Sequence, residues 1–110
     1  MKHYIPILSI AGSDCSGGAG IQADLKTISA LGSYAATAIT AITVQNTCGV
    51  SDIFPVPAET VKAQIAAVME DIHPEAIKIG MVNDPSVIRV IAESIRTYHP
   101  RYVVLDPVMV

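Results

Sequence analysis

The stretch IPILSIAGSDCSGGAGIQADLKTISALG, residues 5–32, contains an apolar run, a glycine-rich loop and a segment with helical period. The continuous hydrophobicity of residues 5–10 predicts a strand that is buried on both faces. The apolar residues after the loop recur at the spacing of one helical stripe, and Gly32 stands where a glycine commonly ends a helix. This stripe consists of Ile21, Leu25, Ile28 and Leu31. The stretch therefore predicts a strand, a loop and a helix in succession.

Three further short apolar segments, residues 35–44, 76–79 and 102–105, also predict buried strands. Segments with helical period separate them, so strands and helices alternate along the chain. This order implies right-handed crossovers and a largely parallel sheet. We therefore expect an α/β fold. Residues 46–57 depart from the alternation, because a polar turn and two prolines predict a flap or a short edge hairpin.

Two more helices are predicted between these strands. The first carries an apolar stripe and ends at a His-Pro pair: its residues are Val61, Ile65, Val68 and Ile72, followed by His73 and Pro74. The second begins at Asp84-Pro85, an N-cap and a first-turn proline, and ends at His99-Pro100. Its core-facing residues are expected to be Ile88, Ile91 and Ile95.

The composition places the chain among single-domain globular proteins and excludes several classes of function. The chain has 110 residues, of which 51% are hydrophobic and 15% charged, and its formal net charge is −3. The seven basic residues are scattered, which argues against a nucleic-acid partner. No apolar run approaches the roughly 20 residues that span a bilayer, so we expect no membrane insertion. Cys15 and Cys48 are read as reduced thiols of a cytoplasmic protein.

The chain stops a few residues after its last predicted strand, without a helix to cover that strand. A complete doubly wound domain rarely ends there. We therefore expect residues 1–110 to be the N-terminal part of a longer polypeptide, within one domain.

Polar or small residues follow each predicted strand, where parallel α/β proteins bind ligands. The loop of residues 11–20 is a candidate binding loop, because its glycines allow backbone N–H groups to approach a ligand, although it could equally be a tight turn. It matches neither the phosphate loop that ends in Gly-Lys-Ser/Thr nor the G-x-G-x-x-G spacing.

Four side chains near these strand ends are candidates for chemistry, and three of them also have a plainer interpretation. Asp24 could accept a hydrogen bond from a substrate, or only face the dipole of its helix. Gln45 could pair with an aminopyrimidine edge through its amide. Asp106 could hold Mg²⁺, directly or through water, or be a turn residue before a proline. Met81 is more commonly a core residue than a ligand contact.

Four segments, in order along the whole chain, resemble the hydroxymethylpyrimidine/phosphomethylpyrimidine kinases of thiamine biosynthesis, in the ribokinase-like superfamily. They are AGSDCSGGAGIQADLKT (residues 11–27), TVQNTCG (43–49), KIGM (78–81) and LDPVMV (105–110). The resemblance implies a ribokinase-like sheet, incomplete at its C-terminal end. It also implies phosphorylation of 4-amino-5-hydroxymethyl-2-methylpyrimidine and then of its monophosphate, with ATP and Mg²⁺, and a homodimer of the full-length protein.

The resemblance also assigns roles to particular positions. Gly12 and Asp24 would lie beside the hydroxymethyl end of the substrate, and Gln45 would read the pyrimidine edge. The ring would pack against Met81 in a pocket that Val44 and Val108 also line. Asp106 would lie by the phosphates of Mg-ATP.

Two departures from the family pattern are visible. The family's glycine-rich motif with the catalytic base lies beyond residue 110, so no catalytic residue is assigned in this chain. Cys15 stands where the family usually has serine.

Three other functions remain open at this point. A pyridoxal/pyridoxine kinase of the same branch would phosphorylate a different ring. A non-catalytic module would keep the pyrimidine pocket without transferring phosphate. A plainer possibility is an oligomerisation fragment whose exposed apolar edge seeks a partner chain.

Overall fold

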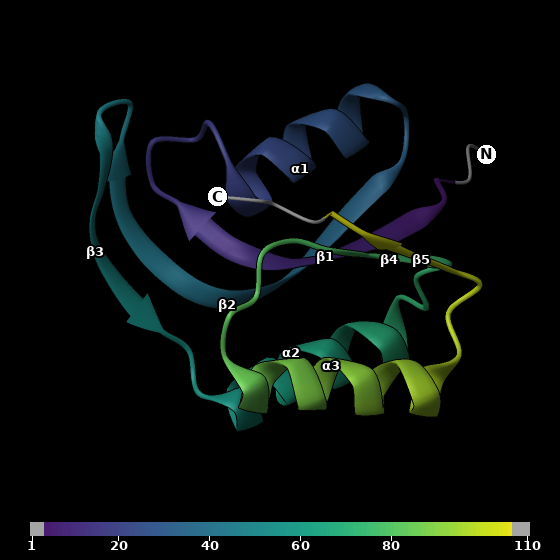
Figure 1. The fold of residues 1–110 in the computed structure, drawn as a ribbon. Helices are drawn as coiled ribbons and strands as arrows, with labels where there is room; N and C mark the ends of the chain where they lie inside the picture. Colours follow the sequence, from purple (N-terminus) through teal and green to yellow (C-terminus); the bar gives the residue numbers. More distant parts are fainter. Residues whose placement is uncertain (1–3, 107–110) are drawn as a thin grey trace.

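Five strands form one sheet in the order β3-β2-β1-β4-β5, and three helices cover its faces in a computed structural model that describes residues 4–106 (Figure 1). The strands are β1 (Pro6–Asp14), β2 (Tyr34–Asn46), β3 (Gly49–Pro55), β4 (Ala76–Ile79) and β5 (Tyr102–Leu105). The helices are α1 (Gly20–Ala30), α2 (Ala58–Asp71) and α3 (Pro85–Tyr98). Within these residues no helix is both long and apolar enough to cross a membrane.

The sheet is parallel except at one edge. β1 pairs in parallel with β2 on one side and β4 on the other, and β5 pairs in parallel with β4. β3 runs antiparallel to β2 and forms the edge hairpin that residues 46–57 predict. The α/β class and the largely parallel sheet are therefore confirmed.

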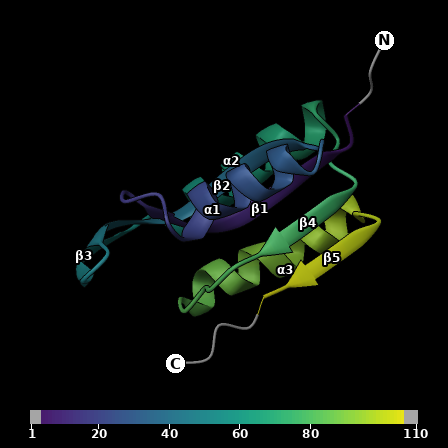
Figure 2. The ribbon, with the colours of Figure 1, turned by 90° about the horizontal axis from the view of Figure 1, so that it is seen from above.

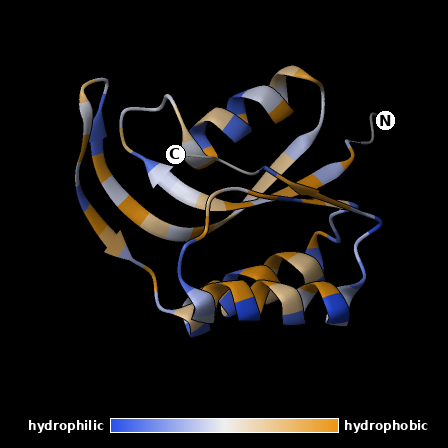
Figure 3. Cartoon of the chain, in the orientation of Figure 1, coloured by the Kyte–Doolittle hydropathy of each residue, from blue (hydrophilic) through white to orange (hydrophobic). Residues whose placement is uncertain are grey.

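The helices lie in two layers, with α1 on one face of the sheet and α2 and α3 on the other (Figures 1 and 2). The main core lies between the sheet and the α2–α3 layer. Side chains of alternate strand residues enter this core, and orange and pale residues alternate along β2 in Figure 3. The core consists of Leu8, Ile10, Ala36, Ala38, Val61, Ile65, Met69, Ile77, Val87 and Ile91.

The apolar stripes of α1 and α3 differ from the predicted ones. In α1 only Ile21 is buried, and Leu31 lies beyond the last turn and is 79% exposed. In α3 the prediction is confirmed for Ile91, which is buried, and for Ile95, which packs against the core, but it is wrong for Ile88, which is half-exposed. Val87 is buried in its place. Val87 and Ile88 are adjacent apolar residues, so the periodicity alone does not choose between them.

The predicted helix ends are confirmed for α2 and α3. The Asp84 side chain accepts a hydrogen bond from the backbone N–H of Ser86 and caps α3. Each of the two helices is followed by a histidine with positive φ, His73 at 55° and His99 at 48°, directly before a proline. The chain leaves both helices there because proline cannot continue them.

The prediction that the last strand is buried is wrong. All four residues of β5 are exposed, from 44% at Val103 to 65% at Leu105. β5 is an edge strand, and within residues 4–106 only β4 pairs with it. An apolar run predicts a strand in the right place here, but burial depends on neighbours that the run itself does not specify.

Candidate substrate site

One cavity of about 760 Å³ lies where the parallel strands β1, β2 and β4 end. The β1–α1 loop, the β2–β3 hairpin and the β4–α3 loop surround it, and Asp106 follows β5 at its rim. Its lining includes glycines, a methionine and polar or charged side chains: Gly12, Asp24, Thr43, Gln45, Lys78, Gly80, Met81 and Asp106. The strand ends therefore converge on one site, as parallel topology requires.

The glycine-rich loop is organised by a buried carboxylate, Asp14. One of its oxygens accepts hydrogen bonds from the backbone N–H and hydroxyl of Ser16, and the other accepts from the N–H groups of Gly18 and Ala19, at 2.7–3.0 Å. The Ser16 hydroxyl foremost, and then these backbone groups, lower the pKa of Asp14 from its ordinary value of 3.8. These amides are therefore occupied, and the expectation that the loop offers them to a ligand is wrong for these three residues.

Gly12 lies at an irregularity of β1 where the strand approaches the cavity. The register with β2 shifts between Ala11 and Ser13, so Gly12 has no partner in that ladder. Gly20, with φ of 59°, packs so closely against the Gly12 carbonyl that a Cβ atom would collide with it. The close approach of these two glycines shapes the part of the cavity where Gly12 was predicted to bind substrate.

Asp24 lies on α1 and faces the sheet, not solvent. Its carboxylate accepts a hydrogen bond from the Ser9 hydroxyl at 2.7 Å and from the Lys78 ammonium at 3.0 Å on both oxygens. Lys78 also lies 3.7 Å from a carboxylate oxygen of Asp106. The reading of Asp24 as a surface residue facing only its helix dipole is therefore excluded, because it belongs to a charged cluster in the cavity wall.

Gln45 is held at the end of β2 by two neighbours. Its backbone N–H donates to the sulfur of Cys15 at 3.3 Å, and the Cys15 thiol donates to its carbonyl at 3.0 Å. The hydroxyl of Thr43 donates to the Ser13 carbonyl at 2.7 Å and lies 3.1 Å from Oε1 of Gln45. The glycine-rich loop and β2 together therefore position the amide that was predicted to read the pyrimidine.

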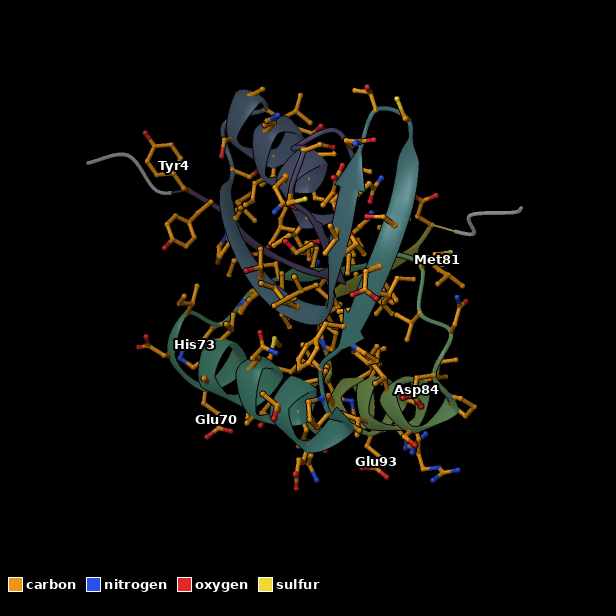
Figure 4. The ribbon with its side chains drawn as sticks, turned by 90° about the vertical axis from the view of Figure 1, so that its left-hand side faces the viewer. Tyr4, Glu70, His73, Met81, Asp84 and Glu93 are labelled. Atoms are coloured by element: carbon orange, nitrogen blue, oxygen red, sulfur yellow. The ribbon has the colours of Figure 1, made fainter. Side chains whose placement is uncertain are left out.

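The remaining predicted site residues have different outcomes. Met81, labelled in Figure 4, lies on the β4–α3 loop. It lines the cavity. Val44 is half-exposed and does not line it, because successive strand residues point to opposite faces and both Thr43 and Gln45 point inward. Val108 lies outside the described residues, so its predicted contact stays a prediction.

Sequence reasoning missed Asp14, Lys78 and Ser9 as organisers of the site. A signal was present for two of them, because Ser9 and Lys78 are the polar residues of otherwise apolar strand segments. β1 and β4 pair these two residues directly. A lysine within a short buried strand requires a partner for its charge, and that requirement points to a carboxylate nearby.

Within residues 4–106 there is no group of three or more His, Cys, Asp or Glu side chains that could hold a metal ion by itself. Asp106 supplies a single, half-exposed carboxylate at the rim of the cavity. Mg²⁺ is commonly held by one or two carboxylates together with water and substrate phosphates. Asp106 therefore fits a shared magnesium site and does not fit a closed protein cage.

Comparison with known proteins identifies the family. The family model described as phosphomethylpyrimidine kinase matches residues 14–110. A hydroxymethylpyrimidine/phosphomethylpyrimidine kinase from Rhizobium meliloti is 59% identical over 103 residues, which cover 94% of this chain and 38% of the relative. The chain spans about 40% of the length of such curated relatives.

Solved structures share the fold. A phosphomethylpyrimidine kinase from Clostridium difficile matches with a TM-score of 0.93 and 57% identity, over 96% of this chain and 46% of that one. A pyridoxal kinase from Staphylococcus aureus, solved with AMP-PCP and pyridoxal, matches with a TM-score of 0.86 and 39% identity, over 97% and 40%. The extent of the family match establishes that this chain belongs to the phosphomethylpyrimidine kinase family.

Proposed function

We propose that the protein containing this chain is a kinase of thiamine biosynthesis. It phosphorylates 4-amino-5-hydroxymethyl-2-methylpyrimidine and then the resulting monophosphate, with ATP as donor. Residues 1–110 contribute the substrate-binding part of one kinase domain. The observation that carries the proposal is the convergence of Gly12, Asp24, Gln45 and Met81 on one cavity in a member of this family.

The cavity suits a small aminopyrimidine. The Gln45 amide pairs with the ring edge, accepting from the exocyclic amine and donating to a ring nitrogen. Met81 packs on the ring, and Gly12 and Asp24 flank the hydroxymethyl group. In the first reaction the hydroxymethyl oxygen bonds to the γ-phosphorus of ATP, the bond to ADP breaks, and the hydroxyl proton is released. Such a transfer depends chiefly on positioning and charge neutralisation.

Asp106 lies where the nucleotide phosphates are expected in this proposal. Its carboxylate, together with water and phosphate oxygens, would hold Mg²⁺, and the cation would neutralise charge on the transferring phosphoryl group. A structural neighbour solved with AMP-PCP supports ATP as the donor. A cytoplasmic location, consistent with two exposed and unpaired cysteines, and a homodimer complete the proposal.

Pyridoxal kinase activity is the second candidate, because a solved pyridoxal kinase shares this fold at 39% identity. The 57% identity to a phosphomethylpyrimidine kinase favours the pyrimidine. The test is a competition assay with ATP and Mg²⁺, in which the protein encoded by the gene receives the aminopyrimidine and pyridoxal together. Preferential formation of the pyrimidine phosphates supports the proposal, and preferential formation of pyridoxal phosphate overturns it.

A further inference from the structure

Lys78 is the charged centre of the cavity wall. It lies on β4, directly beside Ser9 of β1, and its side chain is only 24% exposed. Its ammonium group reaches Asp24 on α1 at 3.0 Å and Asp106 after β5 at 3.7 Å. Three elements that are distant in sequence therefore meet at one cation.

The two carboxylates depend on this lysine to different degrees. The Asp24 side chain is 17% exposed, and its described partners are Lys78 and the uncharged Ser9 hydroxyl. The Asp106 side chain is 55% exposed and is therefore solvated as well as paired. A largely buried carboxylate without a cation is costly, whereas an exposed one is not. Lys78 therefore acts mainly on Asp24 and only weakly on Asp106.

We propose that Lys78 is a positioning residue that orients Asp24 toward the acceptor end of the substrate and links it to Asp106 at the phosphate end. The proposal rests on the function proposed above. Lys78 itself donates to both oxygens of Asp24, so it sets the plane of that carboxylate. The longer contact leaves Asp106 free to exchange the lysine for another cation at the rim.

A double-mutant cycle between Lys78 and Asp24 tests this, in the protein as its gene encodes it. Binding of the aminopyrimidine is measured by calorimetry without nucleotide, and kcat and KM are measured with ATP. We expect Lys78→Met to weaken pyrimidine binding about 10- to 100-fold and to lower kcat as well, because Asp24 loses a charged hydrogen bond. In an Asp24→Asn background the same change should cost less than about twofold, because Lys78 acts through Asp24.

Two further variants separate positioning from general damage. Lys78→Arg retains the cation and should restore most of the lost affinity. Lys62→Met is the matched control, because Lys62 is an exposed lysine of α2 whose ammonium lies 4.0 Å from Glu93, away from the cavity. It should leave both binding and kcat unchanged. If Lys78→Met does not fold, Lys78→Gln replaces it in the same cycle.

Wild-type affinity and turnover in the Lys78 variant would overturn the proposal. An undiminished loss in the Asp24→Asn background would overturn it equally, because Lys78 would then act by another route. Failure of the wild-type protein to bind or phosphorylate the pyrimidine is a distinct result, which refutes the proposed function itself.

Discussion

Asp14 shows how one carboxylate determines the shape of a loop. Four hydrogen bonds from Ser16, Gly18 and Ala19 converge on its two oxygens. An asparagine side chain keeps only one of these oxygens and places an NH₂ group against backbone donors. Asp14→Asn should therefore destabilise the protein at pH 7 and accelerate amide hydrogen exchange at these three residues.

The Asp14 contribution also has a defined pH dependence. Its folded-state pKa lies below the ordinary value of 3.8, so its stabilisation is present above about pH 3.8 and is lost as pH falls through the folded pKa. The difference in unfolding free energy between wild type and Asp14→Asn should therefore shrink from pH 7 to pH 3. Urea unfolding at both pH values measures it, and a difference that stays constant would exclude this role.

Gln45 carries the proposed recognition of the pyrimidine edge. Gln45→Ala should weaken pyrimidine binding by about 1–3 kcal/mol, because the polar edge of the bound ring is left without a partner. Calorimetry on the gene-encoded protein measures this change. Val44→Ala is the matched control, because Val44 points away from the cavity and its truncation should alter affinity little. Unchanged affinity in Gln45→Ala would remove this residue from the site.

The end of a strand is a position that the sequence can predict. Gln45 and Met81 both line the cavity, because each lies at the end of a strand whose direction is predictable, and their contacts with a pyrimidine stay predictions. Lys78 was not predicted, because its role depends on Asp24, which lies 54 residues away in the sequence. A lysine in an apolar strand indicates that a carboxylate lies nearby, but the sequence spacing does not say which residue supplies it.

The turn between β1 and α1 depends on a glycine that has both an unusual backbone conformation and a close neighbour. Gly20→Ala introduces a positive-φ alanine and a collision with the Gly12 carbonyl, and should cost about 3 kcal/mol or more. Gly32 has φ of 84°, but a Cβ atom at this position would meet nothing within 4 Å. Gly32→Ala should therefore cost only about 1–2 kcal/mol.

Urea unfolding of the two glycine variants separates steric collision from backbone strain. Gly20→Ala should also reduce pyrimidine affinity, because it displaces Gly12 at the cavity, whereas Gly32→Ala should not. Equal losses of stability in the two variants would show that the close packing of Gly12 and Gly20 contributes nothing.

The elements themselves were predicted more accurately than their surroundings. All four predicted strands and three predicted helices are present, and the hairpin forms where two prolines interrupt the alternation. β1 extends through Asp14 and not only to residue 10, because pairing with β2 continues beyond the apolar run. Local pattern identifies an element, whereas its length depends on hydrogen bonds to a neighbouring strand.

The packing of α3 is decided by the whole molecule. Ile91 is 4% exposed in the core, and Ile88, three residues earlier, is 49% exposed. Ile91→Ala should lower the unfolding free energy by about 2–5 kcal/mol, since it leaves a cavity. Ile88→Ala should change it by no more than about 0.5 kcal/mol. Urea unfolding of both variants is the measurement, and the reverse order would mean that α3 turns Ile88 and not Ile91 toward the core.

The sequence by itself determined the α/β class, the order of the elements and the edge of the sheet at which the site forms. These follow from local periodicity and from the rule that parallel strands end together. Tertiary structure alone decided that Val87 and not Ile88 joins Ile91 in the core, and that the Asp14 carboxylate accepts the N–H groups of its own loop. It also decided that Lys78 joins Asp24 to Asp106. The physical reason is that burial and charge pairing are properties of contacts between distant segments, which no local pattern encodes.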